Sequence, residues 1–141
     1  MWCRLFAALS LFSAVVGCGG AGSPRQGIYG KVTVDSQPLA TGVITFKPAE
    51  GTMGPVVGAS IANGKYRLSA GEGPVLGDYR VEISSTKKGD QKVVVVPGEE
   101  PGYMAIETIP PQYNKKSTLT AKIEKGNNEQ DFELSSAAAK P

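Results

Sequence analysis

Residues 77–84, Gly-Asp-Tyr-Arg-Val-Glu-Ile-Ser, decide the fold class of this 141-residue chain. Apolar and polar residues alternate along this octapeptide, so Tyr79, Val81 and Ile83 would share one face. A period of two is typical of a strand with one buried face and one solvated face. The Gly-Asp pair that opens the stretch is typical of a turn. The sequence therefore predicts a half-buried β-strand here.

The same alternation recurs along the rest of the chain and is separated by turn residues. Glycine and proline total 28 residues, which disfavours helices, and no helical stripe is found beyond the N-terminal leader. Asn63-Gly64 is a strong hairpin signal. These features predict an all-β fold, a single antiparallel β-sandwich. The further alternating runs cover residues 28–34, 43–47, 65–69, 118–124 and 131–134.

One long segment lacks this regular pattern. Residues 93–96 are a continuous apolar run, which predicts either a strand buried on both faces or an edge strand. Residues 97–116 then contain four prolines and show no clear periodicity. A loop of this length in a small domain is either functional or packed down as an arm.

The N-terminus has the three parts of a secretory signal. Residues 1–4 carry the terminal amine and Arg4, residues 5–16 are mainly apolar, and Gly17 is small. A membrane-spanning helix needs roughly 20 apolar residues, and this stretch is shorter. Residues 1–17 are therefore predicted to be a signal peptide.

The residues around the cleavage site suggest a lipid anchor. Val15-Val16-Gly17-Cys18 resembles the lipobox of bacterial lipoproteins, in which the cysteine receives the lipid. Cys18 is thus the candidate lipid-attachment residue, and the protein is expected to be exported and held on the cell envelope. Gly19 slightly favours the outer membrane over the inner one. The alternative is an ordinary secreted protein in which Cys18 is incidental.

The mature chain is predicted to form one domain with a flexible segment at each end. Residues 18–27 form a glycine-rich tether, residues 28–134 form the β-sandwich, and residues 135–141 form a disordered tail. Cys3 leaves with the leader, so the domain is expected to contain no disulfide. The formal net charge of the whole chain is only +2, and its charges are mixed. Nucleic acid is therefore not an expected partner.

Several short motifs, in their order, resemble a known family. Residues 30–46 have the strand–turn–strand form GKVTV, QPL and GVITF, and they are followed by NGKYRL at 63–68, GDYRVEI at 77–83 and IPPQYN at 109–114. This order resembles small bacterial lipoproteins with a carboxypeptidase-regulatory-like, transthyretin-like domain. The resemblance implies a seven- or eight-stranded Greek-key sandwich without catalytic activity. Four aromatic residues are predicted to fill its core: Phe46, Tyr66, Tyr79 and Phe132.

The residues for catalysis are few. The chain has no histidine, which removes the commonest general base and zinc ligand, and the mature cysteine is expected to be acylated. Glu99, Glu100 and Glu107 are interpreted as solvated loop charges. They also leave a carboxylate-based hydrolase as a further functional hypothesis, beside the two that are given below. No cofactor is expected. No metal site is expected either: Asp and Glu residues in loops suit calcium, but the Asp-x-Asp-x-Asp spacing of a calcium loop is absent from the sequence.

Basic and aromatic residues suggest where a ligand could bind. Lys87, Lys88 and Lys92 are interpreted as a solvated hairpin end, with anionic head groups or glycans as an alternative target. Tyr103 and Tyr113 are candidate ligand contacts, because exposed aromatic rings can stack on sugars or peptides. The competing interpretation is that this arm packs down on the sandwich and buries Tyr113 together with Ile106 and Ile109.

These observations lead to a main functional hypothesis and one alternative to it. The protein is expected to be a membrane-anchored, non-catalytic structural or adhesion module, held on the membrane by its lipid, with an envelope glycan or protein as candidate partner. The alternative is a glycan- or peptide-binding module that uses residues 97–114.

Overall fold

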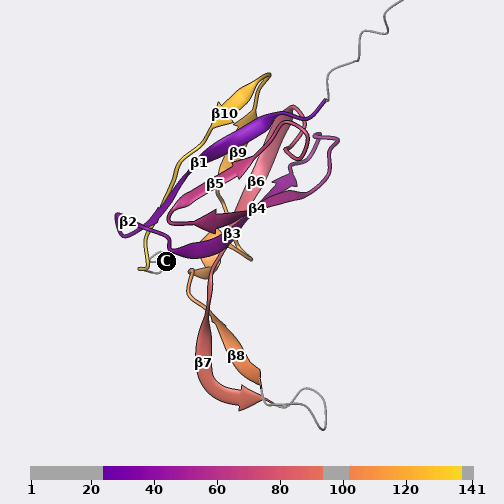
Figure 1. Cartoon of the computed structure of the whole chain (residues 1–141). Coiled ribbons are helices and arrows are strands. Elements are labelled where there is room, and N and C mark those ends of the chain that lie inside the picture. The colour runs from indigo at the N-terminus through magenta and orange to yellow at the C-terminus, as the bar shows by residue number, and fades with distance from the viewer. Residues whose placement is uncertain (1–23, 94–101, 138–141) are drawn as a thin grey trace, which may run out of the picture.

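The computed structural model describes residues 24–93 and 102–137, and these form an all-β protein (Figure 1). One large curled sheet makes the body, and a two-stranded sheet projects from it, which confirms the predicted all-β, sandwich-like fold. The body sheet contains β1 (Gly27–Val34), β2 (Gln37–Pro38), β3 (Thr41–Pro48), β4 (Val57–Ala62), β5 (Lys65–Leu68), β6 (Gly77–Ser84), β9 (Thr120–Ile123), β10 (Asn127–Glu129) and β11 (Phe132–Leu134). The projecting sheet contains β7 (Thr86–Val93) and β8 (Gly102–Glu107), and a 3-10 helix, η1 (Pro111–Tyr113), follows it.

The strand order of the body is β10-β1-β5-β4-β3-β6-β9, with β2 and β11 also paired to β1. Nine strands replace the expected seven or eight because β2 is an additional short strand and the C-terminal run splits into β10 and β11. The expectation of purely antiparallel pairing was wrong at one edge. There, β1 runs parallel to both β10 and β11.

A buried asparagine joins the two ends of the curled sheet. Asn128 Nδ2 donates to the carbonyl oxygens of Gly27 (3.1 Å), Glu124 (3.0 Å) and Gly126 (3.3 Å). Its Oδ1 accepts the Glu124 N–H at 2.8 Å. The side chain therefore links the end of β9 to the start of β1, and it satisfies backbone groups that the sheet itself leaves unpaired.

The four predicted core aromatics are all buried. Tyr79 and Phe46 are fully enclosed, and Tyr66 and Phe132 are 3% and 7% exposed. The Tyr66 hydroxyl donates to the Gln130 carbonyl at 2.7 Å. Burial, and secondarily the Asp131 carboxylate, raise the pKa of Tyr66, so its hydroxyl remains a neutral donor. Tyr79 accepts a hydrogen bond from a main-chain N–H. The core prediction is confirmed.

The predicted turns use positive backbone angles. Asn63 and Gly64, between β4 and β5, have φ values of 50° and 71°, as a two-residue hairpin of type I′ requires. Asp35 and Ser36, between β1 and β2, have φ values of 49° and 66° without any glycine. The second turn therefore adopts a left-handed conformation at some energetic cost.

Strand register places the start of β1 and the end of β6 at opposite ends of the body. Val43 lies opposite Ser84, the last residue of β6, and also opposite Ser60, close to the turn between β4 and β5. That turn adjoins the middle of β1, whereas Ile28 at the start of β1 lies opposite Leu68 at the far end of β5. In Figure 1 the chain accordingly enters β1 at the top, and β7 leaves at the bottom.

Candidate functional site

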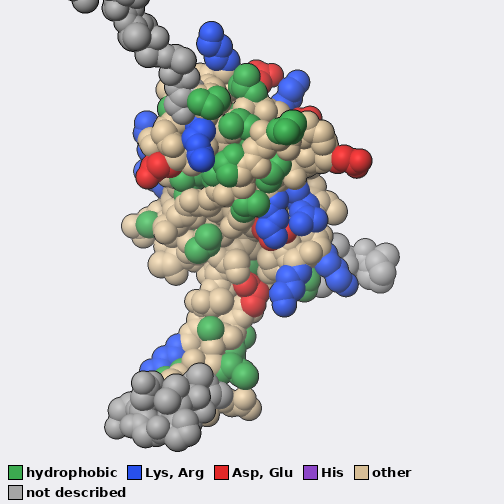
Figure 2. Space-filling model, turned by 90° about the vertical axis from the view of Figure 1, so that its right-hand side faces the viewer, with side chains coloured by type: hydrophobic (Ala, Val, Ile, Leu, Met, Phe, Trp, Pro, Cys, Tyr) green, Lys and Arg blue, Asp and Glu red, His purple; other side chains and the backbone are tan. Residues whose placement is uncertain are grey.

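The β7–β8 hairpin extends the body along the direction of β6. Only Ser85 separates β6 from β7, so one strand direction continues from the body into the projection. Figure 2 shows the hairpin as a narrow extension that carries both hydrophobic and basic side chains. Residues 86–92 and 102–107 of the hairpin are all exposed except Gly89.

One face of the hairpin combines an aromatic ring with two lysines. Lys88 lies opposite Ala105, and Lys92 lies opposite Tyr103. The ammonium nitrogens of Lys88 and Lys92 lie 3.5 Å and 5.9 Å from the centre of the Tyr103 ring. These distances are within the range of cation–π attraction. Tyr103 itself remains 42% exposed, so the ring is available to a ligand.

A bulge in β7 produces this arrangement. Four steps along β7, from Lys88 to Lys92, match only two steps along β8. A bulge of this kind changes the direction in which side chains point. Here it places both lysines beside the Tyr103 ring. Gly89 lies within the bulge, and a Cβ atom there would come within 2.6 Å of the Met104 carbonyl oxygen. Glycine is therefore required for the close approach of the two strands.

Among the described strands, the outer edge of β8 is unpaired, and it is uncharged up to Ile106. From Gly102 to Ile106 the strand has no charged residue, and among the described strands it pairs only with β7. Met104 and Ile106 are 50% and 44% exposed. β7 differs, because it carries the three lysines that were predicted to form a solvated hairpin end, and these are exposed as expected.

A groove lined mainly by residues of polar type lies where the hairpin meets the body. It has a volume of about 540 Å³ and lies against the outer face of β3 and β6. The hairpin contributes the face that also bears Tyr103, and the segment that begins with η1 closes the other side. The lining residues are Thr45, Glu82, Ser84, Thr86, Ala105, Glu107, Ile109, Pro111, Asn114 and Lys115.

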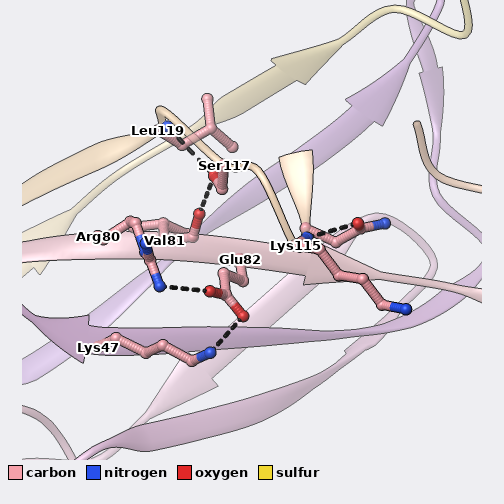
Figure 3. Close-up of polar contacts among 8 residues, drawn as sticks. Lys47, Arg80, Val81, Glu82, Lys115, Ser117 and Leu119 are labelled. Carbon is pink, nitrogen blue, oxygen red and sulfur yellow. Dashed lines mark hydrogen bonds and ion pairs between the residues drawn. The ribbon is translucent and has the colours of Figure 1, made fainter. Parts of the chain in front are cut away.

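The carboxylate of Glu82 in this groove is already paired (Figure 3). Lys47 Nζ lies 2.7 Å from Glu82 Oε2, and Arg80 Nη2 lies 3.0 Å from Oε1. Nearby, Ser117 Oγ donates to the Val81 carbonyl and accepts the Leu119 N–H at 3.2 Å. Ser117 thus fixes the segment that follows η1 against β6, and with it the Lys115 side of the groove.

Glu107 is exposed, as the prediction of a solvated charge expects, but it lies at the end of β8 and also joins the hairpin to the body. Its Oε2 accepts a hydrogen bond from Ser84 Oγ, and its Oε1 accepts the N–H groups of Ser85 (2.9 Å), Thr108 (3.1 Å) and Ile109 (2.9 Å). Desolvation opposes ionisation of Glu107. The hydrogen bonds outweigh desolvation and lower the pKa of this carboxyl. The carboxylate therefore remains ionised at neutral pH and braces the hairpin root.

The two candidate tyrosines lie in different environments. Tyr113 is half-buried against the core, and its hydroxyl accepts the Ser135 N–H at 3.2 Å. Ile109, beside it, is only 3% exposed. The packed-arm interpretation is therefore correct for Ile109 and Tyr113 and wrong for Ile106. The structure does not bring Tyr103 and Tyr113 into one site.

Other predicted residues lie outside the described part of the chain. These are Cys18, Glu99 and Glu100, together with the apolar residues 94–96. Within residues 24–93 and 102–137, no group of three or more potential ligands could hold a metal ion. No helix in the same residues is long and apolar enough to cross a membrane.

The sequence predicted a hairpin end at the three lysines but not its second strand, β8, although a signal for that strand was present. In residues 102–107 (GYMAIE), Tyr103 alternates with Met104 and Ile106, but apolar residues lie on both faces. A strand in the body would show one polar face. Two apolar faces on a short run whose single charge is at its last residue are consistent with a strand that lies outside the sandwich. Comparison of the chain with family models, with curated proteins and with solved structures gave no match.

Proposed function

We propose that this protein is a membrane-anchored, non-catalytic adhesion module that binds an extended segment of a partner protein along β8. The observation that carries the proposal is the exposed β8 edge on a hairpin that projects from the body. This edge is uncharged from Gly102 to Ile106, and no other described strand besides β7 pairs with β8. An isolated two-stranded hairpin is marginally stable in water, and a third strand stabilises it. Strand addition supplies main-chain hydrogen bonds, and side-chain contacts supply selectivity.

The two faces of the hairpin would give such a ligand its selectivity. A strand added to β8 would place alternate side chains over Tyr103 and over Met104 and Ile106. Lys88 and Lys92 beside the ring favour an acidic or aromatic residue in the ligand. The groove at the hairpin root would receive the end of the same segment.

The proposed anchor fits the position of the hairpin. A lipid on Cys18 would hold the chain through the nine-residue segment that precedes Gly27. Because β1 begins at the opposite end of the body from β7, the tether would join the body at the end opposite the hairpin and leave the hairpin free of the attachment. An adhesion element at that end is consistent with a carboxypeptidase-regulatory-like lipoprotein, the family that we propose from the sequence motifs.

The chemistry of the groove supports a binding role over a hydrolytic one. Glu82 is paired with two cations, and Glu107 accepts four hydrogen bonds from the protein. A general acid needs a raised pKa, whereas the pKa of Glu107 is lowered. The chain also has no histidine to act as a general base.

A peptide display experiment tests the binding role. The probe is a phage library of linear peptides, selected on the wild-type protein. Met104→Lys places a charge on the β8 edge, which opposes strand addition. Met53→Lys is the matched control, because Met53 is an exposed methionine of the body (94% exposed).

Selected peptides should lose binding to Met104→Lys and keep it on Met53→Lys. Tyr103→Ala should weaken binding about tenfold, a typical loss for an aromatic contact. Hydrogen exchange of residues 102–107 should slow when a peptide binds. Equal binding to both lysine variants would refute strand addition. Detergent phase partitioning of wild type against Cys18→Ala tests the anchor, and partitioning of both into the aqueous phase would refute it.

A further inference from the structure

A second hollow lies on the outer face of the body sheet, away from the hairpin. It has a volume of about 490 Å³ and spans β10, β1, β5 and β4. The proposed binding role of β8 does not use this surface. The lining residues are Tyr29, Gly30, Lys31, Ser60, Ala62, Lys65, Tyr66, Arg67 and Glu129.

Three cations gather in this hollow. Lys31 lies directly opposite Lys65, and Arg67 follows two residues later on the same face of β5. Like charges placed directly opposite each other destabilise a strand pair. None of the ion pairs among the described residues involves these three side chains. The Asp131 carboxylate bonds the Lys31 main-chain N–H at 2.7 Å. The sheet therefore carries a concentration of positive charge that a bound anion would relieve.

An aromatic ring orients one of these cations. Tyr29 lies opposite Arg67, and the guanidinium carbon lies 5.6 Å from the ring centre. An arginine held against an aromatic face keeps its N–H edge free for a bidentate contact with a carboxylate or sulfate. Lys31 and Lys65 form the next cross-strand pair on the same face of the sheet, two residues from the pair of Tyr29 and Arg67. Together the three groups match an anion that bears charges at intervals.

The rest of the hollow favours a sugar chain over a peptide. Ser60 and Ala62 are small and exposed, so the β4 part of the surface is low and open. Glu129, opposite Tyr29 on β10, can accept hydrogen bonds from ligand hydroxyls. An acidic peptide offers few hydroxyl donors to this carboxylate. A polyhydroxylated chain with spaced acidic groups satisfies both the cations and Glu129.

We infer that this hollow is a binding site for an acidic polysaccharide, with Arg67, Lys31 and Lys65 on its anionic groups and Glu129 on its hydroxyls. The ligand class is a glycan that carries carboxylate or sulfate groups. A molecule with this site and the β8 edge could hold a glycan and a protein at the same time.

Calorimetric titration at low salt tests the site with four probes. Oligogalacturonate carries carboxylates, a heparin oligosaccharide carries sulfates, a dextran oligosaccharide is neutral, and oligoglutamate is an acidic peptide. The test variant is Lys31→Gln with Lys65→Gln. The matched control is Lys122→Gln with Lys125→Gln, which removes the same charge from exposed positions on and after β9.

At least one acidic glycan should bind the wild type, and the test variant should weaken that binding about tenfold. The control pair should change it less than about twofold. Arg67→Lys should also weaken binding, since it keeps the charge and loses the bidentate geometry. Met104→Lys should leave glycan binding unchanged, which separates this site from the β8 edge.

Four results would overturn the inference. They are absence of binding to both acidic glycans, equal binding of oligoglutamate, equal binding of dextran, and equal loss in the control pair. The test variant should fold, because both lysines are exposed, and its thermal midpoint should equal or exceed that of the wild type once the like-charge pair is removed. A lower midpoint would contradict the argument that the pair is repulsive.

Discussion

The Glu107 carboxylate joins the hairpin to the body, so changing it should loosen the hairpin without unfolding the sheet. Glu107→Ala removes the acceptor for Ser84 Oγ and for three main-chain N–H groups. Glu107→Gln keeps a similar shape and one acceptor oxygen, but it loses the negative charge. The two variants together separate the hydrogen-bond geometry from the charge.

The magnitude follows from the number of bonds and their exposure. Glu107 is exposed, so water screens its charge-assisted bonds. Each bond then counts near the lower end of the range for hydrogen bonds, about 0.5 kcal/mol. Four such bonds give about 2 kcal/mol for Glu107→Ala. Glu107→Gln should cost about half as much, about 1 kcal/mol, because charge roughly doubles the strength of a hydrogen bond.

Native-state hydrogen exchange measured by mass spectrometry is the suitable assay. A loss of about 2 kcal/mol corresponds to roughly 30-fold faster exchange in residues 86–93 and 102–107. Protection of β3 and β6 should change little, because their pairing lies within the body sheet. Unchanged exchange in the hairpin would refute the bracing role of Glu107. Equal acceleration in β3 and β6 would show that Glu107 stabilises the whole fold instead.

The lowered pKa of Glu107 also predicts a dependence on pH. A carboxyl whose pKa is lower in the folded state stabilises that state fully above its ordinary value of 4.5. This contribution is lost as the pH falls through the lowered folded value. After correction for intrinsic exchange rates, hairpin protection should therefore fall in acid for the wild type. Glu107→Gln should lack that component of the acid response, and an identical pH response in both proteins would contradict the assignment.

Substitutions at three positions of the body test other parts of the structure. Ser36→Gly should stabilise the fold by about 0.5–1 kcal/mol in chemical denaturation, because it relieves a left-handed φ of 66°, whereas Ser36→Ala should give no such gain. Asn128→Ala should destabilise by about 2–4 kcal/mol, because it leaves buried backbone groups unpaired where the sheet closes. Gly30→Ala should destabilise the fold by about 3 kcal/mol or more, because its Cβ would lie 1.8 Å from the Gln130 carbonyl oxygen. A stability equal to that of the wild type would show that the Gln130 backbone does not pack directly against Gly30.

The body was predictable because its strands obey local rules. Tyr79 alternates with polar neighbours, and Asn63-Gly64 supplies the two positive φ values that a tight hairpin needs. The parallel pairing of β1 with β10 and β11 was not predictable in this way. It depends on the hydrogen bonds from Asn128 to the Gly27 carbonyl and from the Gln130 N–H to the Tyr29 carbonyl, which join residues about a hundred positions apart. Period-two alternation carries no information on strand direction.

The candidate site was predicted only in part, for a related reason. Residues 97–114 were treated as one segment, yet Glu107 divides the described part into an exposed strand and a packed turn. Tyr103 precedes Glu107 in the chain and is exposed on the hairpin. Tyr113 follows Glu107 and packs against the core. The bulge at Gly89 was equally hidden, because a glycine in sequence does not say which backbone approaches it.

The two edges of the hairpin differ in a way that constrains any complex it forms. Lys87, Lys88 and Lys92 all belong to β7, and lysines on an edge strand oppose the addition of another strand. β8 has no such protection between Gly102 and Ile106. Repeated stacking of this chain would require the β8 edge of one copy to pair with the β7 edge of the next, and the β7 lysines oppose that step. The proposed strand addition should therefore stop after one partner segment and give a one-to-one complex rather than a filament.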